Sequence, residues 1–135
     1  MSTKVKEEAG AEAGAERRLN MIEAINDDFG RRSADETRLA EIMPSLEGIH
    51  YASKRVRRWM KPSRRKVGLA FQPAKAQVVY QPLGVVGIIV PWNYPLFLAI
   101  GPLVTALSAG NRAMIKMSES TPRTAEVVTR MLGEI

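Results

Sequence analysis

The sequence predicts an α/β fold in which N-terminal helices are followed by the start of a parallel-sheet domain that is incomplete. One observation is the order of segments in residues 82–122, where two short apolar runs flank a long uncharged segment, as in a strand-helix-strand unit. Another is the helical periodicity of apolar residues within residues 17–66. With 135 residues, of which 45% are hydrophobic and 25% charged, the chain has the length of one globular domain at most.

The N-terminal third is expected to be helical after a short tail. Residues 1–16 are mostly Lys, Glu, Ala and Gly, and this lack of apolar side chains predicts a mobile tail. Residues 17–29 then follow a helical pattern that Gly30 ends. The side chains expected to face the core are those of Leu19, Ile22, Ile25 and Phe29.

Two more helices complete the expected N-terminal helical segment, residues 17–66. Ser33 and Glu36 form a Ser-x-x-Glu capping box, and Pro44 marks either the end of that helix or the first turn of the next one, over residues 45–60. His50, the only histidine, is expected to have a hydrogen-bonded structural role rather than a catalytic one. The inward residues are expected to be Leu39, Ile42 and Met43, followed by Leu46, Ile49, Val56, Trp59 and Met60.

Residues 82–122 are the unit on which the functional prediction depends. Residues 85–90 predict a buried strand, Pro95 suits the first turn of a helix that Gly110 ends, and residues 113–117 predict a second strand. The strands of such a crossover run parallel and therefore end at the same edge of the sheet, where open α/β sheets bind ligands. The residues expected to meet at this edge are Trp92, Asn93, Lys116, Ser118 and Glu119.

The segments GVVGIIVPWNYPL, PLVTALSAGN and IKMSESTP resemble the front half of the cofactor domain of the NAD(P)-dependent aldehyde dehydrogenase family. The segments FGRRSADET, RRWMKPSRRKV and YQPLGVVGI are similar to its class 3-like branch, and the resemblance runs from Arg18 to the end. It implies that residues 82–135 are the first strand-helix-strand-helix part of an NAD-binding domain. It also implies that residues 67–81, with strands expected at 67–71 and 76–80, help to form the interface of a homo-oligomer.

The resemblance implies a catalytic role for Asn93. In the family, a cysteine thiolate attacks an aldehyde, hydride passes to the nicotinamide, and water hydrolyses the thioester to the carboxylic acid. Asn93, in PWNYP, matches the amide donor that stabilises the oxyanion of the covalent steps. The residues alone leave open a second interpretation, in which Asn93 caps the helix that begins near Pro95. An aromatic aldehyde similar to coniferyl aldehyde is one candidate substrate.

The resemblance also implies a cofactor site at the end of the second strand. Lys116 and Glu119 match the pair that holds the adenine-side ribose, and Ser118 lies on the same turn. A carboxylate at this position favours NAD over NADP, which remains an alternative. Without the resemblance, Lys116 and Glu119 are solvated residues at a strand end. Met117 departs from the proline that many members carry after the lysine, which could loosen the turn.

The end of the first strand supplies the other implied cofactor contacts. Val90, Pro91 and Trp92, together with Asn93, match the segment that forms an apolar wall beside the nicotinamide ribose. By default these apolar residues would belong to the core.

The chain contains no cysteine, which excludes a disulfide framework, a thiolate metal site and a cysteine nucleophile within these 135 residues. In family members the nucleophile, the glutamate that activates water and the whole catalytic domain lie beyond the position of Ile135. We therefore expect an N-terminal fragment that has no dehydrogenase turnover by itself and binds NAD weakly or not at all. No secretory signal opens the chain, so the expected compartment is the cytoplasm.

Three alternatives remain besides an enzyme fragment. Residues 54–66 contain eight basic side chains around Trp59, a composition that invites a nucleic-acid-binding module, although no second aromatic platform is evident. The 36 uncharged residues between Lys75 and Arg112 are long enough for a membrane span, but four prolines interrupt them. Neither nucleic acid nor membrane is the expected partner. The third alternative is a noncatalytic remnant that pairs with full-length subunits through residues 67–80.

Overall fold

The computed structural model describes the backbone of residues 3–133 and the side chains of residues 14–17 and 20–133. Its elements are, in chain order, α1 (Thr3–Phe29), α2 (Ala34–Thr37), a π-helical segment (Arg38–Ile42), α3 (Met43–Trp59), β1 (Ser63–Arg65), a 3-10 turn (Leu69–Phe71), β2 (Ala76–Val78), β3 (Val85–Ile89), α4 (Pro95–Ser108), β4 (Arg112–Lys116) and α5 (Pro122–Gly133).

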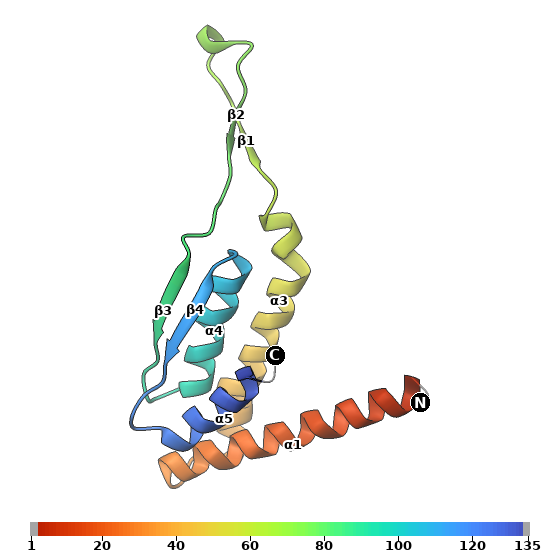
Figure 1. The fold of residues 1–135 in the computed structure, drawn as a ribbon, viewed down its shortest axis with the longest axis vertical. Coiled ribbons are helices and arrows are strands. Elements are labelled where there is room, and N and C mark those ends of the chain that lie inside the picture. Colours follow the sequence, from red (N-terminus) through yellow and green to blue (C-terminus); the bar gives the residue numbers. More distant parts are fainter. Residues whose placement is uncertain (1–2, 134–135) are drawn as a thin grey trace.

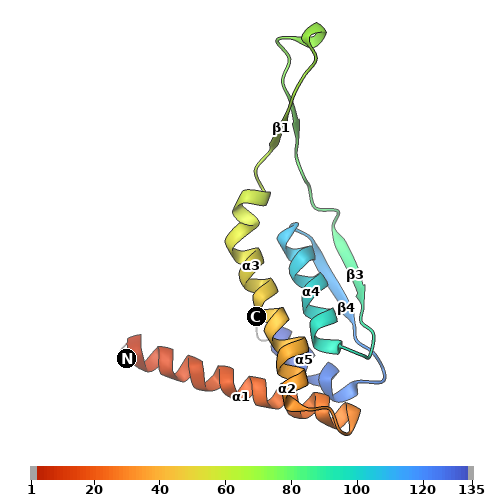
Figure 2. The ribbon, with the colours of Figure 1, turned by 180° about the vertical axis from the view of Figure 1, so that it is seen from behind.

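Helix α4 lies at the centre, between α3 on one side and the β3–β4 pair on the other (Figures 1 and 2). Helices α1 and α5 pack together at one end of this arrangement, and the β1–β2 hairpin projects from the opposite end. One apolar cluster joins α1, α4 and α5 through Met21, Ile25, Leu96, Ile100 and Val128. A second cluster places Ile88 and Val90 against Ala99 of α4. The predicted α/β class is therefore confirmed, with helices packed on one face of a small parallel sheet.

Helix α1 is longer than predicted. It begins at Thr3, so the segment expected to be a mobile tail is helical from that residue, because the Ala, Glu and Lys that fill it are strong helix formers. Gly30 ends the helix as predicted, with a φ of 76° that favours glycine. Of the predicted inward residues, Ile25 is fully buried, while the side chain of Leu19 lies outside the described ones. Met21, which the prediction omitted, is buried beside Ile25.

Helices α2 and α3 form one continuous run that passes through Pro44. Proline lacks the N–H that an α-helical turn would use, and the run accommodates it through the π-helical segment, in which the Met43 N–H bonds to the Arg38 carbonyl. The predicted inward face of this segment is wrong for Leu39 and Met43, which are 62% and 45% exposed. The inward stripe is polar instead and consists of Thr37, Glu41 and Ser45, because Glu41 meets unpaired backbone N–H groups of α4.

The inward face predicted for the helix over residues 45–60 is also largely exposed to solvent. Leu46, Ile49, Trp59 and Met60 are exposed, whereas Ala52 is the buried apolar residue of α3. The imidazole of His50 is exposed and makes no hydrogen bond to the described residues, so its expected hydrogen-bonded role is not seen. Among the described helices, none is both long and apolar enough to cross a membrane.

The projecting hairpin differs from its prediction in its first strand. β1 covers Ser63–Arg65 and pairs antiparallel with β2, so that Arg65 lies opposite Ala76. This register leaves residues 66–75 as the connecting loop, and the 67–71 segment predicted to be a strand forms local turns instead. Its N–H groups are satisfied locally, since Phe71 donates to the Gly68 carbonyl and Gln72 to the Leu69 carbonyl. β2 (Ala76–Val78) confirms the first three residues of the second predicted strand, 76–80.

The crossover of residues 82–122 is confirmed in order and direction, while β3 ends one residue earlier than predicted and β4 begins and ends one residue earlier. β3 and β4 pair in parallel, from Val85 opposite Arg112 to Ile89 opposite Lys116. Helix α4 starts at Pro95 and continues through Pro102, and Gly110 follows it with a φ of 80°. The side-chain oxygen of Asn111 then accepts hydrogen bonds from the N–H groups of Leu83 and Gly84, which fixes the start of β3 beside the start of β4.

Candidate functional site

The carboxyl ends of β3 and β4 lie side by side, as the sequence predicts. The last ladder pair joins Ile89 to Lys116, and the Val90 N–H continues the ladder by donating to the Lys116 carbonyl at 2.9 Å. The chain leaves the sheet at this point on both strands, toward Asn93 in one case and Ser118 in the other. Two segments separated by more than twenty residues in sequence therefore share one edge of the sheet.

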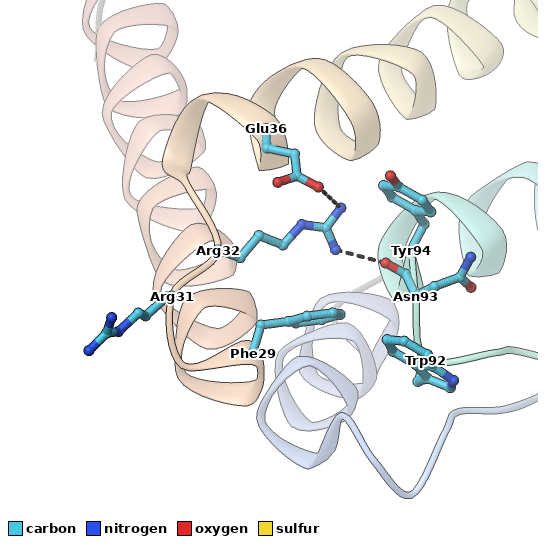
Figure 3. A pocket seen from close by; sticks show the side chains of 7 residues that line it. All are labelled: Phe29, Arg31, Arg32, Glu36, Trp92, Asn93 and Tyr94. Atoms are coloured by element: carbon cyan, nitrogen blue, oxygen red, sulfur yellow. Dashed lines mark hydrogen bonds and ion pairs between the residues drawn. The ribbon is translucent and has the colours of Figure 1, made fainter.

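Asn93 presents a free side chain at this edge. It is exposed, and its amide makes no hydrogen bond within the described part of the chain, whereas its main-chain carbonyl is bound by Arg32 (Figure 3). The N-cap residue of α4 is Tyr94, which supplies no side-chain capping bond. The interpretation of Asn93 as the helix cap therefore has no support from the geometry, and its amide remains available to a ligand.

A buried carboxylate from the N-terminal half caps α4 instead. Glu41 Oε2 accepts hydrogen bonds from the N–H of Leu96 at 2.7 Å and of Phe97 at 3.2 Å. These are first-turn donors that have no partner inside the helix. The role of Glu41 was not predicted, because Asn93 offered a local candidate for the cap of α4 and nothing in the sequence pointed to an acceptor 55 positions away.

Arg32 connects this carboxylate to the Asn93 turn. Its NH1 group donates to the Asn93 carbonyl at 2.8 Å and lies 3.0 Å from Glu41 Oε1, while NH2 lies 3.4 Å from a Glu36 carboxylate oxygen. Figure 3 shows the guanidinium between the Glu36 carboxylate and the Asn93 carbonyl, and it also lies over the rings of Phe29 and Tyr94. Only half of the predicted capping box is present, because Ser33 caps α2 while Glu36 turns to Arg32.

Burial dominates the electrostatics of Glu41. Removal from water raises the pKa of this carboxyl above its usual range, and the N–H groups of Phe97 and Leu96 and the charge of Arg32 oppose that rise. Glu36 adds a smaller upward contribution to the pKa through like-charge repulsion. The two N–H groups and Arg32 therefore offset only part of the cost of burying the charged form of Glu41.

An open hollow of about 370 Å³ surrounds the Asn93 turn. Its lining residues are Phe29, Arg31, Arg32, Glu36, Trp92, Asn93 and Tyr94 (Figure 3). The hollow therefore lies between the N-terminal helices and the β3–α4 turn. Lys116, Ser118 and Glu119 are at the neighbouring strand end but do not line it.

Lys116 and Glu119 form an exposed pair at the end of β4. The Lys116 ammonium donates to a Glu119 carboxylate oxygen, and this bond lowers the pKa of Glu119. Ser118 Oγ accepts from the N–H of Ser120 at 3.2 Å, which shapes the turn. Met117 is partly buried and packs against both apolar clusters, so it anchors the end of β4 to the core.

The three residues proposed as the wall beside the cofactor are placed differently from one another. Val90 is buried in the second apolar cluster, which matches the plainer interpretation of a core residue. Pro91 and Trp92 are exposed, and the Trp92 ring lies 6.2 Å from that of Phe29, centroid to centroid. Pro91 and Trp92 are thus the apolar residues of this segment that a ligand at the edge could touch.

A second carboxylate joins the N-terminal half to the crossover. Asp28, at the end of α1, accepts hydrogen bonds from the N–H of Arg123 at 3.0 Å and of Thr124 at 2.8 Å. It also accepts from the Thr124 hydroxyl at 2.7 Å. The sequence gives no hint of this cap, because the two partners are 96 positions apart.

Comparison with known proteins agrees with this geometry. The family model of the aldehyde dehydrogenase family matches residues 8–135. The chain belongs to the aldehyde dehydrogenase family. It is 74% identical over 115 residues to a probable coniferyl aldehyde dehydrogenase of Pseudomonas aeruginosa, an alignment that covers 85% of this chain and 24% of that protein.

Other members of the aldehyde dehydrogenase family extend the comparison. Aldehyde dehydrogenase family 3 member H1 of Arabidopsis thaliana is 38% identical, with 84% of this chain and 23% of that protein covered. A substrate-bound structure of Staphylococcus aureus AldH matches with a TM-score of 0.75 and 34% identity, over 88% of this chain and 28% of that one. The chain therefore spans about a quarter of the length of the curated relatives that it matches.

Proposed function

We propose that this chain is the N-terminal part of an enzyme that oxidises an aldehyde to the carboxylic acid with NAD(P). The observation that carries the proposal is the free Asn93 amide at the edge where β3 and β4 end together. The names of close relatives support coniferyl aldehyde, or a similar aromatic aldehyde, as the first substrate to test.

The proposed role of Asn93 is to donate a hydrogen bond to the oxyanion that develops when a nucleophile adds to the aldehyde carbon. A fixed amide donor aimed at such an oxygen contributes about 3 kcal/mol of transition-state stabilisation. The nucleophile proposed for the family reaction is a cysteine thiolate, which these 135 residues do not contain. The thiolate, the activated water and the thioester they form and hydrolyse would therefore belong to a further part of the enzyme.

The residues at the end of β4 fit the ribose of a dinucleotide. An ammonium and a carboxylate, Lys116 and Glu119, stand exposed at the carboxyl end of a parallel strand, and together they offer a donor and an acceptor to a diol. Bound NAD(P) would supply the hydride acceptor of the reaction. Glu119 favours NAD, because its negative charge would repel the additional phosphate of NADP. Ser118 shapes the turn that presents Glu119, and Trp92 offers an apolar surface at the neighbouring strand end.

An activity assay tests this function directly. Full-length enzyme containing this segment, mixed with coniferyl aldehyde and NAD, is expected to produce NADH, while the purified 135-residue chain alone is expected to produce none. A full-length enzyme that reduces neither NAD nor NADP with any aldehyde would refute the proposed reaction. Turnover by the 135-residue chain alone would refute its assignment as an incomplete active site.

A second candidate function, binding of nucleic acid, gains one observation. Tyr51 lies beside Trp59, with ring centroids 5.9 Å apart, and the Arg55 guanidinium lies over Tyr51, so an exposed aromatic pair does accompany the basic segment. Aromatic faces among cations can stack bases and bind phosphates. Oligonucleotide binding that weakens steeply with salt and disappears when Arg57 and Arg58 are neutralised would support this candidate, and its absence at low salt would reject it.

A further inference from the structure

We propose that Arg32 and Glu41 are positioning residues that fix the turn bearing Asn93 and so aim its side-chain amide. The proposal rests on the proposed function and deepens it, because it assigns a role in that reaction to two residues of the N-terminal helices. Neither residue belongs to the strand-helix-strand unit, and neither was identified as a site residue from the sequence. What joins them to the site is a set of contacts to the main chain on both sides of Pro95.

The turn is held before and after its proline. On one side, Arg32 NH1 donates to the Asn93 carbonyl at 2.8 Å. On the other side, Glu41 Oε2 accepts from the N–H groups of Leu96 and Phe97. The 3.0 Å ion pair between Arg32 NH1 and Glu41 Oε1 links the Arg32 hydrogen bond before Pro95 to the Glu41 hydrogen bonds after it. A rotation of the Asn93 peptide would therefore break the Arg32 bond and disturb the ion pair beside it.

The side chains of Arg32 and Glu41 are shielded from water. The side chain of Arg32 is 4% exposed and that of Glu41 is 0% exposed. The Phe29 and Tyr94 rings lie 4.8 Å and 4.6 Å from the guanidinium carbon, centroid to atom, and Tyr94 directly follows Asn93. Charge-assisted hydrogen bonds shielded from water are stronger and more directional than exposed ones, so this pair is suited to hold a main-chain group in place.

The direction of the Asn93 side chain depends on its backbone, because that side chain makes no hydrogen bond to the described residues. Figure 3 shows its amide directed away from Arg32 while its main-chain carbonyl points toward the guanidinium. The direction of a side chain without hydrogen bonds of its own follows from the backbone that carries it. Since a displacement of about 1 Å in a reacting geometry can cost about 100-fold in rate, loss of the hold is expected to be visible in catalysis.

Nuclear magnetic resonance of the asparagine side chains tests the hold without any need for activity. In the 135-residue chain labelled with 15N-asparagine, Arg32→Met is expected to shift the Asn93 amide signal and increase its motion on the picosecond to nanosecond timescale. Asn111, which binds Leu83 and Gly84 N–H groups, serves as the internal control and shows whether the crossover remains folded. Arg38→Met, which removes an exposed arginine paired with Asp35, is the matched control.

The Asn93 signals of the variants decide whether Arg32 and Glu41 position the Asn93 amide. An Asn93 signal that is the same in Arg32→Met, Glu41→Gln and unsubstituted chains would overturn the proposal. If Arg32→Met unfolds the chain, Arg32→Lys takes its place in the comparison, because it keeps a cation with a single donor nitrogen beside Glu41. The expected result for Arg32→Lys is an Asn93 signal between those of the Met variant and the unsubstituted chain.

Kinetics of the full-length enzyme test whether the hold acts through Asn93. Arg32→Met is expected to lower kcat about 100-fold while the KM for NAD is retained. In an Asn93→Ala background the same substitution is expected to cause little further loss, because the group that it positions is already absent. Losses that simply multiply would overturn the proposal, since a general structural defect would act in either background. If the unsubstituted enzyme oxidises no aldehyde, the proposed function fails, and the resonance experiment still decides the positioning role.

Discussion

Glu41 is buried at a position that the apolar periodicity of its own helix does not predict. Its neighbours Leu39 and Met43 are apolar and were expected to face inward, but they are exposed, and the carboxylate occupies the interior. A helical apolar face is predictable only when the helix packs against apolar surface. Here the surface opposite is the N-terminus of α4, whose free N–H groups attract an acceptor more strongly than the core attracts a methyl group.

The titration of Glu41 follows from this burial. Because burial raises its pKa in the folded chain, the folded state binds a proton more tightly than the unfolded state. The protonation of Glu41 therefore contributes stability that is fully present below the ordinary glutamate pKa and is lost as the pH rises through the raised value. Carboxyl 13C titration is expected to give Glu41 a midpoint above the ordinary glutamate value. A midpoint at or below that ordinary value would contradict the buried placement.

At the scale of elements, helices α4 and α5 both begin at carboxylates supplied by the N-terminal helical segment. Glu41 binds the first turn of α4, and Asp28 binds the first turn of α5. The strand-helix-strand order could be predicted because β-branched runs, Pro95 and Gly110 are local signals. The caps could not, since they join residues 55 and 96 positions apart. The first strand of the hairpin was also misplaced, because its register depends on its partner rather than on its own β-propensity.

Removal of the Asp28 cap measures how firmly α1 and α5 are joined. Asp28→Ala is expected to lower the free energy of unfolding by about 1 kcal/mol, because two N–H groups and a buried hydroxyl lose their acceptor. Urea denaturation followed by circular dichroism provides the measurement. Asp27→Ala is the matched control, since Asp27 is exposed and adjacent. Equal denaturation midpoints for the two variants would show that the cap contributes nothing.

For the whole molecule, the extent of exposed apolar surface fits a chain that spans about a quarter of its relatives. The two strands of the parallel pair are bare on one face, where Ile89 and Met114 are 83% and 70% exposed. Parallel sheets are normally covered on both faces. The sequence could not show which faces stay open, because that depends on how the helices pack.

The projecting hairpin leads to a prediction about assembly. Leu69 and Phe71, in the 3-10 turn between β1 and β2, are 91% and 71% exposed. The hairpin that carries this turn projects away from the body of the chain (Figure 1). We expect the full-length enzyme to be a homo-oligomer that uses this hairpin, so Leu69→Arg with Phe71→Arg should yield a smaller species in sedimentation velocity. An unchanged sedimentation coefficient, with the fold intact by circular dichroism, would exclude the hairpin from the interface.

The central claim is that the Asn93 amide stabilises an oxyanion at the end of β3. Its most direct test is the single-turnover rate of NADH formation by the full-length enzyme with Asn93→Ala, compared with the unsubstituted enzyme at saturating aldehyde and NAD. Loss of one oxyanion donor is expected to slow this step by about 100- to 1000-fold. A single-turnover rate that Asn93→Ala leaves unchanged, in a protein that still binds NAD, would contradict the claim.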